Sequence, residues 1–163
     1  MTFGTAVHSF KLLIGTLFYA GRIPKAPGTM GSLFFLPFIY GSYVLYNSWG
    51  LTVLTIVASV LSLWTAPASV KEFGEDPGEF VMDECAGQAL VFTGSVAYGL
   101  DLTLTSLLLG FLLFRLFDIT KVLGIKRVEK FPGKFGILFD DLLAGIYASV
   151  GLIALLSLPS LLQ

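Results

Sequence analysis

The chain has 163 residues, the length of one domain; 55% of them are hydrophobic and only 13% are charged. An ordinary soluble domain carries roughly 25% charged residues, so this composition indicates an integral membrane protein. No basic run of the kind that binds nucleic acid is present. The single cysteine, Cys85, excludes an internal disulfide, and the single histidine, His8, argues against a Ser-His-Asp triad or a multi-histidine metal site.

Long uncharged stretches predict the helices. The N-terminal apolar stretch, residues 12–20, is short and lacks a cleavage site, so it predicts an interfacial or packed helix. A membrane-spanning helix needs about 20 mostly apolar residues. We expect one all-α domain over residues 1–163, an integral membrane helical bundle with about five transmembrane helices plus the N-terminal helix. The candidate spans are 33–46, 51–66, 87–99, 102–117 and 142–162, and the turn-like Asn47-Ser48-Trp49-Gly50 separates the first two.

The charges predict the topology. With five spans, the connecting segments 21–32, 67–86 and 118–141 share one side, and every Lys and Arg lies there or at its edge. The opposite side carries only Asp101. The positive-inside rule then predicts a multi-pass protein whose polar loops face the cytoplasm. Because several spans are short, a soluble helical bundle with an unusually apolar core is the alternative.

Residues 22–33, RIPKAPGTMGSL, form the first polar segment on that side. Two prolines and two glycines prevent a continuous helix and leave backbone N–H groups free. Thr29 and Ser32 can cap the helix that follows, so that its positive dipole end faces this loop. With Lys25 beside it, the loop suits a phosphate; a capped re-entrant turn without a ligand is the alternative.

The second polar segment is KEFGEDPGEFVMDECAGQ, residues 71–88. Its first four acids surround Gly74, Pro77 and Gly78 and are expected to form a solvated loop. Asp83 and Glu84 differ, because they open directly onto an apolar helix. The helix dipole alone would favour acids at this position, and this is the simpler explanation.

The third polar segment consists of FRLFDITK, residues 114–121, a basic loop, and FDDLLAG, residues 139–145. Arg115, Asp118 and Lys121 are spaced three apart and share a face of one helix, where a plain salt-bridge ladder is the alternative. Asp140 and Asp141 stand side by side at the entrance to an uncharged run, and ionisable residues at the ends of spans are functional candidates. Small residues, which let helices approach closely, follow at four-residue spacing: Ala144, Gly145, Ala148 and Ser149.

Together, the three segments predict a metal site. If the acids converge on one side of the membrane, their mutual repulsion requires a cation, and ligation by oxygen alone points to Mg²⁺. Nearby lysines and an arginine supply charge for a phosphate. These are the parts needed for metal-assisted phosphoryl transfer or hydrolysis, and the adjoining bilayer favours a lipid substrate. The five acids are Asp83, Glu84, Asp118, Asp140 and Asp141.

Four stretches, in order, resemble motifs of the phosphatidylglycerophosphatase A family: K-APGTMGSL, DE-x-x-GQ, FRLFDITK and GILFDDLLAG. The resemblance covers roughly residues 21–149. It implies a Mg²⁺-dependent membrane phosphatase that removes the terminal phosphate of phosphatidylglycerophosphate, a cytoplasm-facing lipid, to give phosphatidylglycerol in phospholipid biosynthesis. It also implies a location in the inner (cytoplasmic) membrane, with the active site facing the cytoplasm. One departure concerns K-P-x-P-I, which usually follows in the family. Here residues 121–125 contain no proline, which leaves the helix able to run past Lys121.

Roles for the matching residues follow as a hypothesis. One of two aspartates, Asp83 or Asp118, would position or deprotonate the attacking water, or would bind Mg²⁺ as a further ligand; a covalent phospho-aspartate is the competing mechanism. The hypothesis assigns three groups. The catalytic residues are Asp83, Asp118 and Lys121; the metal ligands are Glu84, Asp140 and Asp141; the substrate-binding residues are Lys25, Thr29, Ser32 and Arg115.

Motifs of three other classes of phosphotransfer enzyme and phosphatase are missing from the sequence. The D-x-x-D-G-x-x-A-R run of CDP-alcohol phosphotransferases, the S-G-H motif of histidine-dependent lipid phosphatases and the D-x-D of haloacid-dehalogenase-type phosphatases are all absent. The remaining alternative is a non-enzymatic small membrane transporter or assembly protein whose cytoplasmic acids bind a cation. The sequence leaves the oligomeric state open.

Overall fold

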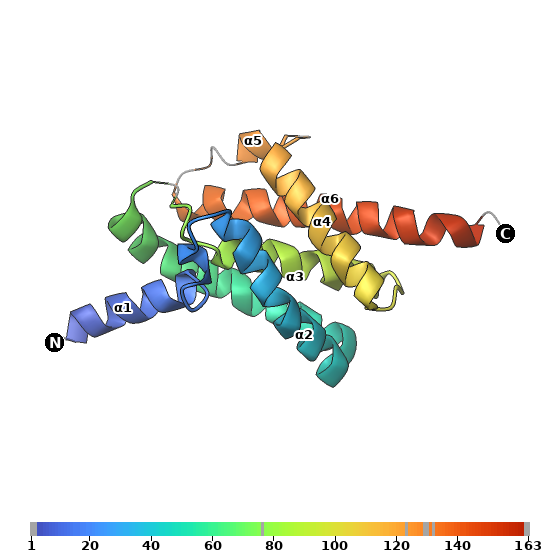
Figure 1. Cartoon of the computed structure of the whole chain (residues 1–163), viewed down its shortest axis with the longest axis horizontal. Coiled ribbons are helices and arrows are strands. Elements are labelled where there is room, and N and C mark those ends of the chain that lie inside the picture. Colours follow the sequence, from blue (N-terminus) through green and yellow to red (C-terminus); the bar gives the residue numbers. More distant parts are fainter. Residues whose placement is uncertain (1–2, 76, 123, 129–130, 132, 162–163) are drawn as a thin grey trace.

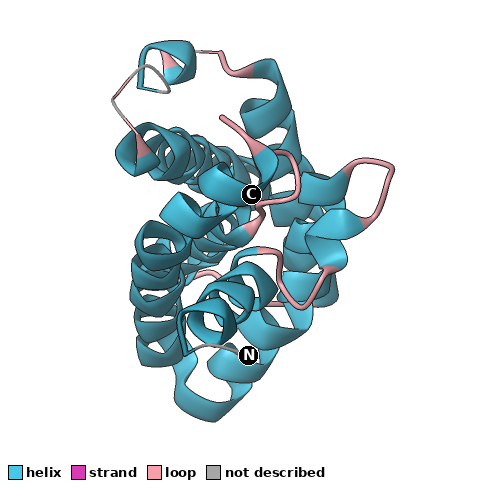
Figure 2. Cartoon of the chain, turned by 90° about the vertical axis from the view of Figure 1, so that its left-hand side faces the viewer, coloured by secondary structure: helices cyan, strands magenta, loops and turns pink. Residues whose placement is uncertain are grey.

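The computed structural model describes residues 3–75, 77–122, 124–128, 131 and 133–161. These residues form helices and no strand, as Figures 1 and 2 show, which confirms the predicted all-α class. The helices of the described residues are α1 (Phe3–Gly15), η1 (Ala20–Arg22), α2 (Pro27–Phe73), α3 (Met82–Ala97), α4 (Leu104–Thr120), α5 (Ile125–Val128) and α6 (Lys134–Leu161).

The long segment α2 consists of two arms. Asn47 interrupts the helical backbone with φ 54° and ψ −141°, and the chain doubles back there (Figure 1). This break falls within the predicted turn at residues 47–50. Both arms are longer than the sequence predicted, because the first begins at Pro27 and the second continues to Phe73.

Two of the described helices are long and apolar enough to cross a bilayer: α2 and the stretch Lys134–Ser157 of α6. The outer surface carries many large apolar side chains; Trp49 is 77% exposed and Leu104 is 72% exposed. A surface of this kind favours a lipid environment over the soluble alternative. With 16 and 17 residues, α3 and α4 are shorter than an average span, and the count of about five transmembrane helices stays a prediction.

Helix α3 lies at the centre, packed between α2 and α6 (Figure 1). Cys85 and Ala89 of α3 and Ala144 of α6 have no exposed surface. The approach of α3 to α6 is very close, since a Cβ on Gly87 would lie 2.5 Å from the backbone carbonyl oxygen of Asp141. The small residues at the start of α6 therefore have the packing role that their spacing predicted.

The predicted N-terminal helix is present, but it occupies an earlier stretch than the apolar residues 12–20. It runs from Phe3 to Gly15 and ends before Leu17, Phe18 and Tyr19, all of which have positive φ. Its C-terminal end is tied to the start of α3, because the N–H of Val81 donates a hydrogen bond of 3.0 Å to the carbonyl oxygen of Gly15.

Candidate active site

A cavity of about 200 Å³ lies where α3 begins, α4 ends and α6 begins. Two predicted polar segments contribute its charged lining, and the first segment, at the start of α2, lies beside it through Gly28. The predicted convergence of the three segments is therefore found in the structure. The charged lining residues are Asp83, Glu84, Asp118, Lys121, Asp140 and Asp141.

Three of the acids form a compact group. Asp83 and Glu84 occupy the first turn of α3, and Asp141 comes from α6. One carboxylate oxygen from each lies within 4.8 Å of the other two. The close crossing at Gly87 brings the backbone of Asp141 against α3, which explains how carboxylates from separate helices reach one point.

This group has the properties of a cation site. Glu84 Oε2 and Asp141 Oδ1 are buried and have no hydrogen-bond partner among the described residues. Asp83 and Glu84 precede the predicted span 87–99 and therefore lie outside the membrane-spanning segments. Burial, followed by the charge of Glu84, raises the pKa of Asp83 well above its usual range, and burial raises the pKa of Glu84 to about 7. Buried oxygens without partners are costly, and a divalent cation with all-oxygen ligands would satisfy them.

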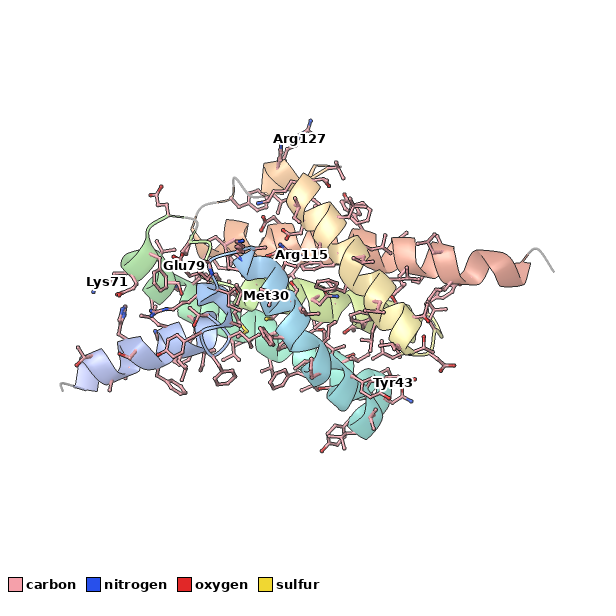
Figure 3. The ribbon with its side chains drawn as sticks, in the orientation of Figure 1. Met30, Tyr43, Lys71, Glu79, Arg115 and Arg127 are labelled. Carbon is pink, nitrogen blue, oxygen red and sulfur yellow. The ribbon has the colours of Figure 1, made fainter. Side chains whose placement is uncertain are left out.

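Arg115 does not line the cavity, but it contacts two of the acids that do. Its Nη1 lies 2.7 Å from Asp118 Oδ2 and 3.9 Å from Glu84 Oε1. The same nitrogen lies 3.5 Å from Ser32 Oγ, so Arg115 also reaches the first arm of α2 (Figure 3). These contacts hold the two carboxylates in place. The substrate-binding role expected for Arg115 and Ser32 stays a prediction.

The start of α2 differs from the expectation. The helix begins at Pro27, directly after Ala26 in a left-handed conformation, so Thr29 and Ser32 lie inside it and do not cap it. Proline explains this early start, because its fixed φ suits the first helical position. Ser32 Oγ instead donates a hydrogen bond of 2.9 Å to the carbonyl oxygen of Gly28.

Lys25 and Thr29 lie at the edge of this region. Lys25 is exposed in the loop before α2, and Thr29 is half-buried in the first turn. Neither belongs to the cavity lining found among the described residues. Their expected contact with a phosphate therefore stays a prediction.

The end of α4 also differs from the expectation. Although proline is missing after Lys121, the helix stops at Thr120, because Lys121 adopts a left-handed conformation (φ 47°, ψ 42°). Its backbone N–H donates a hydrogen bond of 2.8 Å to the carbonyl oxygen of Phe117. The turn carries Lys121 Nζ to within 2.8 Å of Asp140 Oδ2. Asp140, predicted as a metal ligand, is thus ion-paired with a cation of the protein.

Two contributions to the site were missed by sequence reasoning. Pro77 and Gly78 line the cavity, although their segment was expected to be a solvated loop. Gly28 packs so closely on Glu84 that a Cβ there would collide with Glu84 Oε1. The spacing of Gly28 and Ser32, four residues apart in the sequence, is the signal that could have indicated a close helix face.

Comparison with known proteins then identifies the family. The family model described as phosphatidylglycerophosphatase A matches residues 13–156. The chain belongs to the phosphatidylglycerophosphatase A family. As a family member it is a phosphatase, a hydrolase of phosphoric monoesters, and the non-enzymatic alternative is wrong. The matched region contains all six charged residues of the cavity.

Curated relatives agree with this family. A putative phosphatidylinositol-3-phosphatase of Bacteroides thetaiotaomicron is 37% identical over 149 residues, covering 85% of this chain and 89% of the relative. Phosphatidylglycerophosphatase A of Haemophilus influenzae is 33% identical over 148 residues, covering 88% and 86%. That of Escherichia coli is 28% identical over 140 residues, covering 84% and 78%. No solved structure matches the chain.

Proposed function

We propose that this chain hydrolyses the terminal phosphate of phosphatidylglycerophosphate in a Mg²⁺-dependent reaction, giving phosphatidylglycerol and inorganic phosphate. The observation that carries the proposal is a cavity in which three carboxylates lie within 4.8 Å of one another. Lys121 lines the same cavity. The family and its relatives in two organisms support the substrate. The reaction would be a step of glycerophospholipid biosynthesis.

Asp83, Glu84 and Asp141 would hold the Mg²⁺, because one oxygen of each lies within 4.8 Å of the other two. Glu84 and Asp141 each also have a buried oxygen without a partner among the described residues. This set replaces Asp140 of the original hypothesis with Asp83. Asp140 instead orients Lys121, to which it is ion-paired. A bound Mg²⁺ would supply positive charge to polarise the phosphoryl oxygens and neutralise the charge that develops on them.

The remaining residues would bind phosphate and move a proton. Lys121 Nζ lines the cavity and would bind a phosphate oxygen. Asp118, fixed by Arg115, would orient the attacking water and accept its proton as the water oxygen bonds to phosphorus. The bond between phosphorus and the lipid oxygen would break, and that oxygen would take a proton from solvent. Attack by an aspartate oxygen to form a phospho-aspartate, later hydrolysed, is the competing route.

The proposed location is the inner membrane, in a multi-pass arrangement with the cavity facing the cytoplasm. Two long apolar helices and the exposed apolar surface support membrane insertion. The lysines and arginines lie in or at the edge of the connecting segments that also carry the cavity acids, which supports the orientation. There the site would meet the headgroups of the cytoplasmic leaflet.

A second candidate substrate is a phosphorylated phosphatidylinositol, favoured by the name of the relative with 37% identity. Both lipids carry a phosphomonoester on a polyol headgroup and would release inorganic phosphate. The same assay can therefore compare the two substrates. Purified protein in detergent is given each lipid with Mg²⁺, and phosphate release is measured. We expect kcat/KM for phosphatidylglycerophosphate to be at least about tenfold higher. The reverse preference would support the second candidate, and release from neither lipid would contradict the proposal.

A further inference from the structure

One face of α4 changes character along its length. Asp118 lines the cavity, Arg115 lies next to it, and Leu108 and Leu104 line an apolar groove further along. These residues follow at steps of three, seven and four, which keep residues on one face of a helix. At 1.5 Å per residue, the distance along α4 from Asp118 to Leu108 is about 15 Å. The charged site is therefore continued by an apolar surface on the same helix.

The first arm of α2 forms the other wall. Gly28, Ser32, Leu36 and Tyr40 follow at four-residue steps and share its facing side. Ser32 contacts Arg115, and a Cβ on Gly28 would lie 3.2 Å from Arg115 Nη2. One and two turns further, Leu36 and Tyr40 line the apolar groove opposite α4.

The groove is large and open to the outside of the bundle. Its volume is about 510 Å³, and its walls come from α2 and from the start of α4. Tyr40 is 48% exposed, Leu104 is 72% exposed and Leu108 is 49% exposed, so the groove opens on the surface that faces lipid in the proposed arrangement. The residues that line it include Leu36, Pro37, Tyr40, Leu104, Leu107 and Leu108.

We propose that this groove binds an acyl chain of the lipid substrate whose headgroup phosphate occupies the cavity, an inference that rests on the proposed function. Two features indicate an acyl chain as the occupant: the groove lies further along the two helices that carry Arg115 and Ser32, and its lining is apolar and not charged. The groove begins one helical turn beyond Ser32 on α2 and about two turns before Arg115 on α4. An anionic headgroup at Arg115 would place its chains toward this groove. Arg115 Nε, buried and without a hydrogen-bond partner among the described residues, lies at this junction.

The arrangement predicts the substrate class. A ligand that fills both the charged cavity and the apolar groove has a phosphorylated headgroup, a glycerol region at Arg115 and a long hydrocarbon chain along α4. A phosphomonoester without a chain would use the cavity alone. Burial of the chain in the groove then adds binding energy that a water-soluble headgroup lacks, since apolar surface removed from water stabilises a complex.

The first test fills the groove. Leu108→Trp places an indole in it, and Leu116→Trp is the matched control, because Leu116 is a 54% exposed leucine of the same helix outside the groove lining. Phosphate release is measured from long-chain phosphatidylglycerophosphate and from its deacylated, water-soluble headgroup. We expect Leu108→Trp to lower kcat/KM at least about tenfold for the lipid alone, while Leu116→Trp leaves both unchanged. Equal effects of Leu108→Trp on both substrates, or no effect on either, would overturn the proposal.

The second test needs no variant and no turnover. Wild-type protein in vesicles receives phosphatidylglycerophosphate with a photoreactive diazirine near the end of one acyl chain, and labelled peptides are identified after illumination. We expect labelling to concentrate in residues 33–40 and 102–111 and to fall when unlabelled lipid is in excess. Labelling spread evenly over other exposed apolar residues such as Ile146, or a groove protected by a second copy of the chain, would overturn the proposal. Because labelling does not depend on hydrolysis, an inactive protein that still labels here would contradict only the proposed reaction.

Discussion

Gly145 of α6 lies directly against Gly87 of α3, where a Cβ added to Gly145 would be 2.5 Å from the Gly87 carbonyl oxygen. Real Cβ atoms essentially never approach another atom this closely, so only glycine allows this crossing. One turn before Gly145, Asp141 projects from the same helix, and Asp83 lies one turn before Gly87. The crossing of two glycines therefore determines the spacing of the carboxylates.

Replacing Gly145 with alanine tests this relationship. The added methyl group must push α6 away from α3, which moves Asp141 away from Asp83 and Glu84. Because a displacement of about 1 Å can lower catalysis about 100-fold, we expect kcat/KM to fall by that order and the Mg²⁺ concentration for half-activation to rise.

Gly151→Ala is the matched control on the same helix. A Cβ there meets Leu113 Cδ1 at 3.6 Å, an ordinary contact, so activity should be unchanged and the melting temperature equal or slightly higher. If the two alanine variants behave alike in phosphate release and thermal unfolding, the glycine crossing has no role in the site.

Gly28→Ala tests the contact between α2 and the acids. A Cβ at Gly28 would collide with Glu84 Oε1, so the glutamate must move and its contact with Arg115 must change. We expect at least about a tenfold loss of kcat/KM with the fold retained. Gly41→Ala on the same arm, where a Cβ meets nothing within 4 Å, should remain active. Full activity of Gly28→Ala would show that the position of Glu84 is not important.

Lys121 and Asp140 are predicted to act as one unit. Lys121→Met should lower kcat/KM about 100-fold by removing the proposed phosphate contact, and Asp140→Asn should cause a smaller loss because Lys121 is then less well oriented. The double variant should resemble Lys121→Met, since the aspartate acts through the lysine. Steady-state kinetics of all three variants checks this, and fully additive losses would disprove the coupling.

Proton and metal are predicted to compete for Glu84. Its pKa rises from the usual value of 4.5 to about 7 in the folded protein, and burial shifts the pKa of Asp83 in the same direction. Between pH 4.5 and 7, the metal-free folded state therefore binds more protons than the unfolded state, and its free energy of unfolding falls as pH rises. Added Mg²⁺ would replace the proton.

Thermal unfolding in detergent, with chelator or with Mg²⁺, measures this competition. We expect the increase in melting temperature caused by Mg²⁺ to be clearly larger at pH 8 than at pH 5.5. An equal increase at the two pH values, or a larger one at pH 5.5, would contradict the assignment of Glu84 as a ligand. A control with Asp101→Asn, an exposed acid outside the cavity lining, should behave as the wild type.

The sequence predicted the features that depend on local composition. Uncharged runs gave the helical class, and the break at Asn47 followed from the turn-like residues around it. The acids could be assigned to one site because they cluster at the ends of apolar stretches, on the same side of the predicted topology. The small residues at the start of α6 indicated close helix packing, which the structure confirms at Gly145.

What could not be predicted depends on unusual backbone conformations and on tertiary contacts. Ala26 and Lys121 both adopt left-handed conformations that non-glycine residues rarely favour, and these determine where α2 begins and where α4 ends. The ion pair between Lys121 and Asp140 follows from that turn. No sequence spacing distinguishes Asp83 from Asp140 as the third member of the carboxylate group, because the distinction arises only when α3 and α6 are packed together.

Phosphate release from phosphatidylglycerophosphate by the purified protein tests the central claim most directly. It is measured with Mg²⁺, with chelator, and for Glu84→Gln and Asp141→Asn beside Asp101→Asn. The account predicts rapid Mg²⁺-dependent release by the wild type and Asp101→Asn, with losses of at least about 100-fold in the two cavity variants. Undiminished release in chelator, or full activity of Glu84→Gln and Asp141→Asn, would contradict it.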